Sequence, residues 1–381
     1  MSEKILSFCD ISGNSVKNYQ GSRKYIATGD IVNNKICSYT EVEYKNKPSR
    51  ANQEAELGDV LFAKMKETRK VICITEDNVD CIYSTGFYVI KPKKSVLTEY
   101  LYWLFNSSNF NRNKDKLCKG ATQKALNNEG LKKIAIKKLP PIEEQKNIVS
   151  KLNKISSLIN SKMEQLELLD ELIKSQFVEM FGDVGKNDKN WEYTTLGKKC
   201  LFNPKKSELK NMNENFEVSF VPMLSVSENG NIDTNIIKKY DDVKKGFTYF
   251  AENDVLFAKI TPCMENGKGA VAVGLKNKIG FGSTEFHVLR PKENINSVWL
   301  YTLTAMKSFR IEAERKMTGS AGQKRVPISF FKNYNLGLPP IELQNKFADI
   351  VKQIDKQKFE IEKSLKEMQE LYESLMGKYF G

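Results

Sequence analysis

The chain has 381 residues, 40% of them hydrophobic and 10% aromatic, which suffices for two or three domains and excludes a disordered chain. No run of 18 apolar residues and no N-terminal signal pattern occurs, so neither a transmembrane helix nor a secretory leader is expected. The seven cysteines are scattered and never spaced as CxxC, which predicts reduced thiols and a cytoplasmic location. A single histidine, His287, gives no spacing for a zinc site or a catalytic triad, and we predict no metal.

The net charge of +13 is unevenly distributed along the chain. Residues 1–139 carry 24 Lys and Arg against 15 Asp and Glu, and residues 184–338 carry 24 against 16. Residues 140–183 carry 5 against 8, and residues 339–381 carry 7 against 8. Because Lys and Arg neutralise phosphates, two basic segments of this size indicate a polyanionic partner such as nucleic acid. A generally lysine-rich surface is the alternative interpretation.

The sequence contains an internal repeat. Sequence blocks of the first half return in the second half in the same order, at an offset of 195–199 residues. The pairs are 25–31 with 220–226 (a looser match), 58–64 with 253–259, 84–92 with 283–291, and 139–143 with 338–342. A fixed order and a nearly constant offset indicate a duplicated structural unit.

Each copy predicts strands, then a helix, then a polar loop. Short β-branched and aromatic runs at 60–63 and 87–90, with their counterparts, are typical of strands. Apolar residues at helical spacing follow Thr98 in the first copy and Ser297 in the second. The loops that come next contain glycine and basic residues, and they span 119–124 and 318–325.

A long helix is predicted after each Pro-Pro pair, because proline and acidic residues favour the first helical turn. Apolar residues then recur at three- and four-residue spacing, and in the second helix only Lys358 interrupts this pattern. Such a narrow seam predicts that the two helices pack as a coiled coil, whereas packing of each helix on its own domain would give a wider apolar stripe. The predicted seam, which we also expect to serve subunit docking, contains Leu152, Ile155, Ile159, Leu166, Ile173, Val351, Ile354, Ile361, Leu365 and Met368.

This layout resembles the specificity subunit of Type I restriction-modification systems over essentially the whole chain. The resemblance is carried by the paired blocks, by the loop with Gly120, Thr122 and Gln123, and by the two Leu-Pro-Pro-Ile-Glu helix starts followed by Gln145 and Gln344. The second loop departs from the first, since Gly322 intervenes and Thr122 has no direct counterpart.

The resemblance implies an α+β fold with two similar α/β target recognition domains joined by two long antiparallel coiled-coil helices, related by a pseudo-two-fold internal repeat. The implied ranges are 1–139 and 184–338 for the recognition domains, and 140–183 and 339–381 for the spacer helices. Each domain would read one half of a bipartite, asymmetric target in double-stranded DNA. The helices would set the half-site spacing and dock two methyltransferase subunits, with restriction subunits in the full complex. SAM, ATP and Mg would belong to partner subunits, and none to this chain.

Basic and amide side chains near the matched blocks are the candidates for DNA contact, since Lys and Arg bind phosphates and Gln can pair with adenine. For each of them an ordinary solvated side chain or a loop-bracing role is the alternative. The candidates are Lys64, Lys66, Arg69, Lys119, Thr122, Gln123, Lys124, Lys259, Thr261, Lys268, Gln323, Lys324 and Arg325.

We predict no catalytic residues. The only Asn-Pro pair begins at Asn203 and is followed by Lys205, so it does not fit an adenine methyltransferase motif. No phosphate-binding GxxxxGK[ST] motif is present. Asp59 and Asp254 recur at matching positions, where a turn role is expected rather than a nuclease site. His287 replaces Tyr88 of the first copy, so a core or sheet-face position is expected. A stand-alone DNA-binding regulator or a coiled-coil scaffold remains the alternative function.

Overall fold

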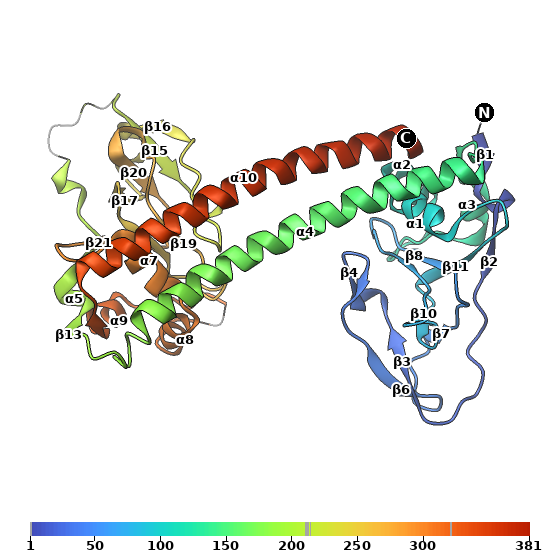
Figure 1. Ribbon diagram of the computed structural model, residues 1–381, viewed down its shortest axis with the longest axis horizontal. Coiled ribbons are helices and arrows are strands. Elements are labelled where there is room, and N and C mark those ends of the chain that lie inside the picture. Colours follow the sequence, from blue (N-terminus) through green and yellow to red (C-terminus); the bar gives the residue numbers. More distant parts are fainter. Residues whose placement is uncertain (1, 210–212, 214, 321) are drawn as a thin grey trace. The chain divides into compact units, whose positions relative to one another are not determined.

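The computed structural model describes residues 2–209, 213, 215–320 and 322–381. The chain forms two compact units: unit 1 contains Met1–Met163 with Lys363–Gly381, and unit 2 contains Glu164–Glu362. Two 40-residue helices, α4 (Ile142–Phe181) and α10 (Ile341–Phe380), each contribute one part to each unit (Figure 1).

Unit 1 contains, in its described residues, two four-stranded sheets and two short strand pairs. The first sheet has the order β2 (Cys9–Ser12), β11 (Phe87–Pro92), β8 (Val60–Ala63), β9 (Val71–Cys73). The second has the order β6 (Thr40–Glu43), β3 (Ser22–Ile26), β10 (Ile82–Ser84), β7 (Ala51–Gln53). The pairs are β1 (Ser2–Lys4) with β12 (Ala135–Lys137), and β4 (Ile31–Val32) with β5 (Lys35–Ile36).

Unit 2 repeats the two sheets and the first of these pairs, again within its described residues. The first sheet has the order β14 (Cys200–Phe202), β21 (Phe286–Pro291), β18 (Val255–Ala258), β19 (Gly269–Val271). The second has the order β16 (Ile237–Lys239), β15 (Glu217–Val221), β20 (Ile279–Gly282), β17 (Thr248–Ala251). The pair is β13 (Glu192–Thr195) with β22 (Asn335–Leu338).

The register of the central strands is the same in both units. Tyr88 of β11 faces Phe62 of β8, and His287 of β21 faces Phe257 of β18, both in antiparallel pairs. The four predicted strands are therefore confirmed, and the sequence repeat corresponds to a repeat of topology.

Helices cover one face of the first sheet in each unit. In unit 1 these are α1 (Thr98–Asn106), α2 (Ser108–Leu117) and α3 (Asn128–Lys133), and in unit 2 they are α7 (Ser297–Ala305), α8 (Lys307–Arg315) and α9 (Ile328–Lys332) (Figure 1). Shorter helices are α5 (Leu196–Lys199), α6 (Tyr240–Val243) and the 3-10 turns Ile5–Ser7, Thr28–Asp30, Lys206–Glu208, Met223–Ser225 and Lys276–Lys278. The apolar faces of α1 and α7 are buried, with Leu101 and Leu300 at 0% exposure, which confirms the helices predicted after Thr98 and Ser297.

The long helices are anchored at their first turns by matched glutamines. The side-chain oxygen of Gln145 accepts from Leu97 N at 2.9 Å, and that of Gln344 accepts from Asn296 N at 2.9 Å. Both glutamines are completely buried and donate back to the Pro carbonyls five residues earlier, Pro140 and Pro339, at 2.8 Å. Each helix start is thus tied to the globular part that precedes it.

The two long helices pack together in antiparallel fashion. In unit 1, Leu152 of α4 shares a hydrophobic core with Met376 and Phe380 near the end of α10. In unit 2, Phe177 near the end of α4 packs against Phe347 near the start of α10, with ring centroids 5.5 Å apart. This arrangement confirms the predicted fold of two α/β domains and two paired helices.

Burial along the helices follows the predicted seam, and it is greatest near the globular parts. Leu152, Ile155, Val351 and Ile354 are buried. The remaining seam residues are half-buried: Ile159, Leu166, Ile173, Ile361, Leu365 and Met368.

Candidate nucleic-acid interface

Two polar loops meet beside the central sheet of unit 1. The loop after β8 (64–69) and the loop after α2 (119–125) are joined by backbone hydrogen bonds, from Lys66 N to Lys124 O at 2.9 Å and from Leu126 N to Lys64 O at 2.9 Å. Side chains of both loops line a surface cavity of about 370 Å³. Residues predicted from separate parts of the sequence, Lys66 and Thr122 to Lys124, are therefore neighbours.

Unit 2 builds the same junction from the loop after β18 (259–268) and the loop at 318–325. Thr261 N donates to Lys324 O at 3.0 Å, and Val326 N donates to Lys259 O at 2.9 Å. These bonds match those of unit 1 residue by residue, so the longer second loop still places Gln323 and Lys324 beside Thr261.

The tips of the second loop of each junction are exposed. The exposed side chains at these tips are those of Thr122, Gln123 and Lys124 in unit 1, and Gln323 and Lys324 in unit 2. Lys119 is also exposed, at the base of its loop, where its backbone pairs with Ala125. A glycine opens each loop with positive φ, +136° at Gly120 and +123° at Gly319. A Cβ there would lie 2.5 Å and 2.9 Å from the carbonyl oxygens of Gln123 and Gln323, so a side chain would disturb the turn.

Lys64 and Lys259 are half-buried, and each donates to a backbone carbonyl. The Lys64 ammonium donates to Thr85 O at 2.9 Å and lies 4.5 Å from the centroid of the Tyr88 ring, and Lys259 donates to Thr284 O at 2.7 Å. Burial lowers the pKa of both lysines. In this conformation each lysine links the start of its own loop to the turn before β11 or β21.

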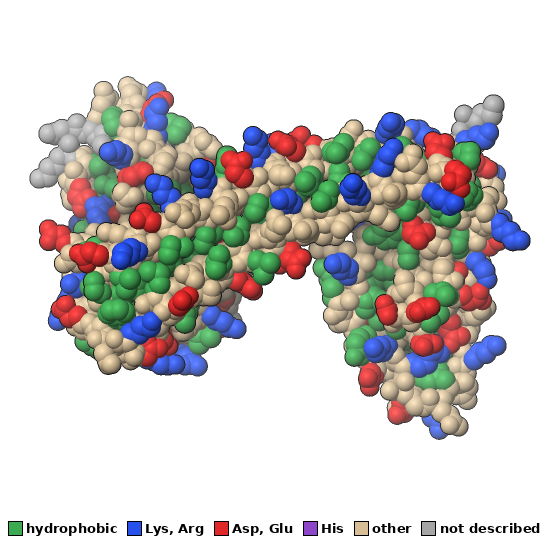
Figure 2. All heavy atoms as spheres, viewed as in Figure 1, with side chains coloured by type: hydrophobic (Ala, Val, Ile, Leu, Met, Phe, Trp, Pro, Cys, Tyr) green, Lys and Arg blue, Asp and Glu red, His purple; other side chains and the backbone are tan. Residues whose placement is uncertain are grey.

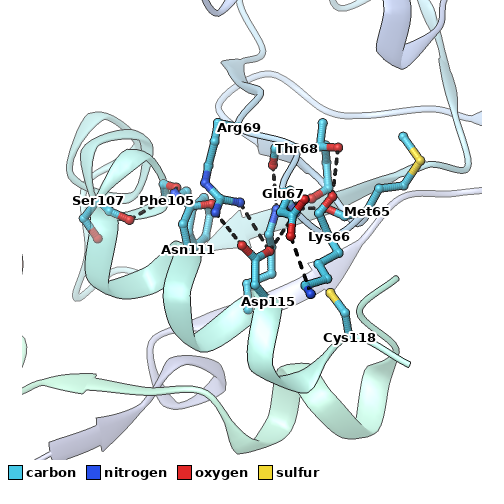
Figure 3. A network of polar contacts seen from close by, with 12 residues as sticks. Met65, Lys66, Glu67, Thr68, Arg69, Phe105, Ser107, Asn111, Asp115 and Cys118 are labelled. Carbon is cyan, nitrogen blue, oxygen red and sulfur yellow. Dashed lines mark hydrogen bonds and ion pairs between the residues drawn. The ribbon is translucent and has the colours of Figure 1, made fainter. Parts of the chain in front are cut away.

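The two predicted arginines are held by acidic side chains. Arg69 forms two hydrogen bonds to Asp115 of α2, which also accepts from the backbone N of Glu67 (Figure 3). Burial raises the pKa of Asp115, but the bonds from Arg69 and Glu67 outweigh it and leave that pKa below its usual value. Arg325 pairs with Glu285 through two bonds of 2.9 Å, and these bonds lower the pKa of Glu285.

Three further predicted residues lie on the first loops of the junctions. Lys66 is exposed and forms an ion pair with Glu67 at 3.5 Å. The hydroxyl of Thr261 donates to Glu265 at 3.1 Å, and Lys268 is half-buried at the end of its loop. All the predicted residues of a unit thus belong to one loop junction. The polar side chains most accessible to a ligand are those at the exposed loop tips.

Two buried cations that no sequence pattern predicted lie under these junctions. Lys114 of α2 is 1% exposed and donates to three carbonyl oxygens of the 63–68 segment. Arg310 of α8 is 6% exposed and donates to carbonyl oxygens of the 264–268 segment. Lys114 lies four residues after the buried Phe110, so the helical spacing itself placed a cation on the apolar face.

His287 is a sheet residue, as expected. It is 6% exposed, its Nε2 lies 2.8 Å from Val326 O, and burial lowers its pKa to about 4. Asp59 and Asp254 accept from the backbone N three residues earlier, at 3.0 and 2.8 Å, which is the turn role expected for them. Among the described residues, no group of three or more His, Cys, Asp and Glu side chains could hold a metal ion.

Charges of both signs are mixed on the face seen in Figure 2. Exposed hydrophobic side chains also occur on the long helices, including Leu158, Leu168 and Leu172 on α4 and Phe359 on α10. Within the described residues, no helix is both long and apolar enough to span a bilayer. All seven cysteines are free thiols.

Comparison with known proteins identifies the family. The model of the Type I restriction modification DNA specificity domain matches twice, at residues 8–169 and 188–371. The chain is 42% identical over 194 residues to the Type I restriction enzyme EcoAI specificity subunit of Escherichia coli, covering 49% of this chain and 32% of the relative. It is 44% identical over 153 residues to the EcoEI specificity subunit of the same species, covering 39% and 25%. The chain thus spans about a quarter to a third of the length of these two relatives.

A solved structure agrees in fold. A chain from a study of complex assembly and conformational transition of the type I R-M system aligns with 99% of this chain and 96% of its own length, with a TM-score of 0.59 and 21% identity. The specificity subunit is the non-catalytic subunit of Type I complexes. With two family-model matches on two topologically equivalent units, the chain belongs to the Type I restriction-modification specificity subunit family.

Proposed function

We propose that this chain selects the DNA target of a Type I restriction-modification complex, with one half-site read by residues 1–139 and the other by residues 184–338. The observation that supports this most strongly is the duplicated loop junction, with exposed Thr122 to Lys124 in one unit and Gln323 and Lys324 in the other. Amide side chains suit hydrogen bonds to base edges, and the lysines beside them suit phosphates. Because the two loops differ in sequence, the two half-sites differ and the target is asymmetric.

The helices at 140–183 and 339–381 form the spacer and the docking surface in this proposal. Their seam is apolar, their net charge is slightly negative, and hydrophobic side chains such as Leu168 remain exposed on them. Two methyltransferase subunits would dock there and bring restriction subunits into the full complex. SAM, ATP and Mg would be bound by those partners.

The test is to map methylated sites in cells that carry the intact system. Gln123→Ala should relax or abolish selection at one half-site only, and Gln323→Ala at the other half-site only. Gln353→Ala removes the same side chain from an exposed position of α10 and should leave both half-sites unchanged. The proposal is wrong if both loop variants keep the wild-type motif, or if a single variant alters both half-sites.

Purification of the tagged chain from such cells separates this function from a stand-alone regulator or scaffold. The proposal requires a methyltransferase in a ratio of two per chain. A chain that binds its target tightly without any methyltransferase would favour the regulator instead.

A further inference from the structure

A buried cation lies beneath the first loop of the unit 1 junction. The Lys114 ammonium donates to the carbonyl oxygens of Ala63 at 3.2 Å, Met65 at 3.1 Å and Thr68 at 2.6 Å. None of the ion pairs in the described part of the chain includes Lys114. A buried charge is costly unless it is well hydrogen-bonded, and here all three acceptors come from a single loop and the strand before it. The cation therefore fixes the path of the 64–69 loop.

Unit 2 has a buried cation in the same place, supplied by Arg310. Its guanidinium donates to Met264 O at 3.1 Å and to Gly267 O at 3.1 Å, and it lies 4.0 Å from the centroid of the Phe257 ring. These carbonyls belong to the 259–268 loop, the counterpart of the loop held by Lys114.

The two cations occupy different positions of the repeat. At the offset of 199 residues that relates the helices, Arg310 corresponds to Asn111, and Lys114 corresponds to Ala313. Asn111 donates to Phe105 O at 2.8 Å, and Arg310 Nε donates to the matching Thr304 O at 2.7 Å (Figure 3 shows Asn111 and Phe105). Arg310 thus makes the bond of Asn111 and also bonds carbonyls of the first loop, as Lys114 does in unit 1, although these carbonyls stand at other positions of the loop. The two units differ in residue type and position, yet both keep a cation under the loop.

The first loops, 64–69 and 259–268, are hydrogen-bonded to the second loops of the two junctions. Lys66 N and Thr261 N bond the carbonyls of Lys124 and Lys324, so a shift of the first loop displaces the exposed tip that contains Gln123 or Gln323. Hydrogen bonds to base edges require side chains placed within about half an ångström, whereas attraction to phosphates does not.

We propose that Lys114 and Arg310 are positioning residues, which set the loop tips for discrimination between DNA sequences without touching DNA. This inference rests on the proposed function. It predicts that loss of the cation lowers the ratio of specific to non-specific affinity at one half-site, and leaves non-specific affinity nearly unchanged.

The experiment uses the full chain with its methyltransferase subunits and two duplexes of equal length. One duplex carries the mapped methylation motif, and the other has only the first half-site scrambled. Lys114→Ala should reduce the ratio of the two affinities by about tenfold, the scale of one lost base contact. Lys116→Ala, which removes an exposed charge from the same helix, is the matched control. A third duplex with the second half-site scrambled should still be discriminated normally by Lys114→Ala.

The double variant Asn111→Arg/Lys114→Ala gives unit 1 the residues that unit 2 has at these positions, Arg310 and Ala313. It should restore the ratio of the two affinities. This rescue would not follow if Lys114 were only a general stabilising residue. If Lys114→Ala does not fold, the double variant decides alone: wild-type discrimination supports the inference, and lost discrimination with a native melting temperature overturns it. An unchanged ratio in folded Lys114→Ala also overturns it. Failure of the wild-type complex to discriminate the duplexes would instead refute the proposed function.

Discussion

Lys358 of α10 is 7% exposed, and its ammonium donates to the carboxylate of Asp170 of α4 at 2.7 Å. Lys358 is the residue that interrupts the apolar seam in the sequence. At the offset of 199 residues, the positions corresponding to Lys358 and Asp170 are Ile159 and Gln369, which line one cavity in unit 1. The helix pair therefore has an ion pair in one unit and an aliphatic residue at the same position in the other.

Removing one partner of this ion pair should destabilise unit 2. Asp170→Ala leaves a buried ammonium without its carboxylate, and we expect a loss on the order of 3 kcal/mol in the free energy of unfolding. This loss is measured by urea unfolding followed by circular dichroism. The control is Glu171→Ala, which changes an exposed neighbour. The double variant Asp170→Leu/Lys358→Ile should unfold at the wild-type urea concentration or above. Equal stability of Asp170→Ala and the control would contradict this role.

A charge introduced into the seam should disrupt the helix pair in unit 1. Ile155 is 6% exposed, so Ile155→Asp buries an unpaired carboxylate and removes apolar contacts, at a cost of about 3 kcal/mol or more. We expect a lower melting temperature and loss of the co-purifying methyltransferase. Ser157→Asp adds the same charge at an exposed position and should change neither. An Ile155→Asp variant that still assembles an active complex would show that docking does not depend on the seam.

Lengthening both helices should lengthen the gap between the half-sites. Four residues inserted after Ser161 extend α4 by roughly 6 Å and keep the seam nearly in phase. Because Ile159 and Gln369 line one cavity, the matching insertion in α10 belongs near Glu367. Methylation mapping should find unchanged half-sites separated by one or two more base pairs, at about 3.4 Å per pair. An unchanged gap in a fully active variant would show that the helices do not measure distance.

His287 should make the stability of unit 2 depend on pH in the acidic range. Its pKa is about 4 in the folded chain and 6.5 in the unfolded chain, so between these values only the unfolded chain binds the proton. Stability from this residue is therefore complete above pH 6.5 and is lost as the pH falls towards 4, by up to about 3 kcal/mol. His287→Gln, which keeps a donor for Val326 O, should show a smaller loss of unfolding free energy between pH 6.5 and 4. The same loss in both proteins would exclude His287 as its source.

The sequence by itself determined the architecture of this protein. Duplicated blocks and Pro-Pro helix starts fix two similar domains and two long helices, because hydrophobic period and turn residues are local properties. The seam from Leu152 to Met368 was readable for the same reason, and Lys358 was visible as its single interruption. The strands at 60–63 and 255–258 followed from their composition.

The tertiary structure alone decided which partners the basic side chains of the loop junctions have. Lys64 and Lys124 look equivalent in sequence, yet one bonds a backbone carbonyl and the other is exposed, because only the folded chain sets which carbonyls lie within reach. The partners Arg69 and Asp115, Arg325 and Glu285, and Lys358 and Asp170 are 40 to 188 residues apart. Lys114 and Arg310 show most clearly why such partners cannot be predicted from the sequence. Their acceptors are main-chain oxygens, which every residue has, so no sequence pattern distinguishes the ones that gather around a buried cation.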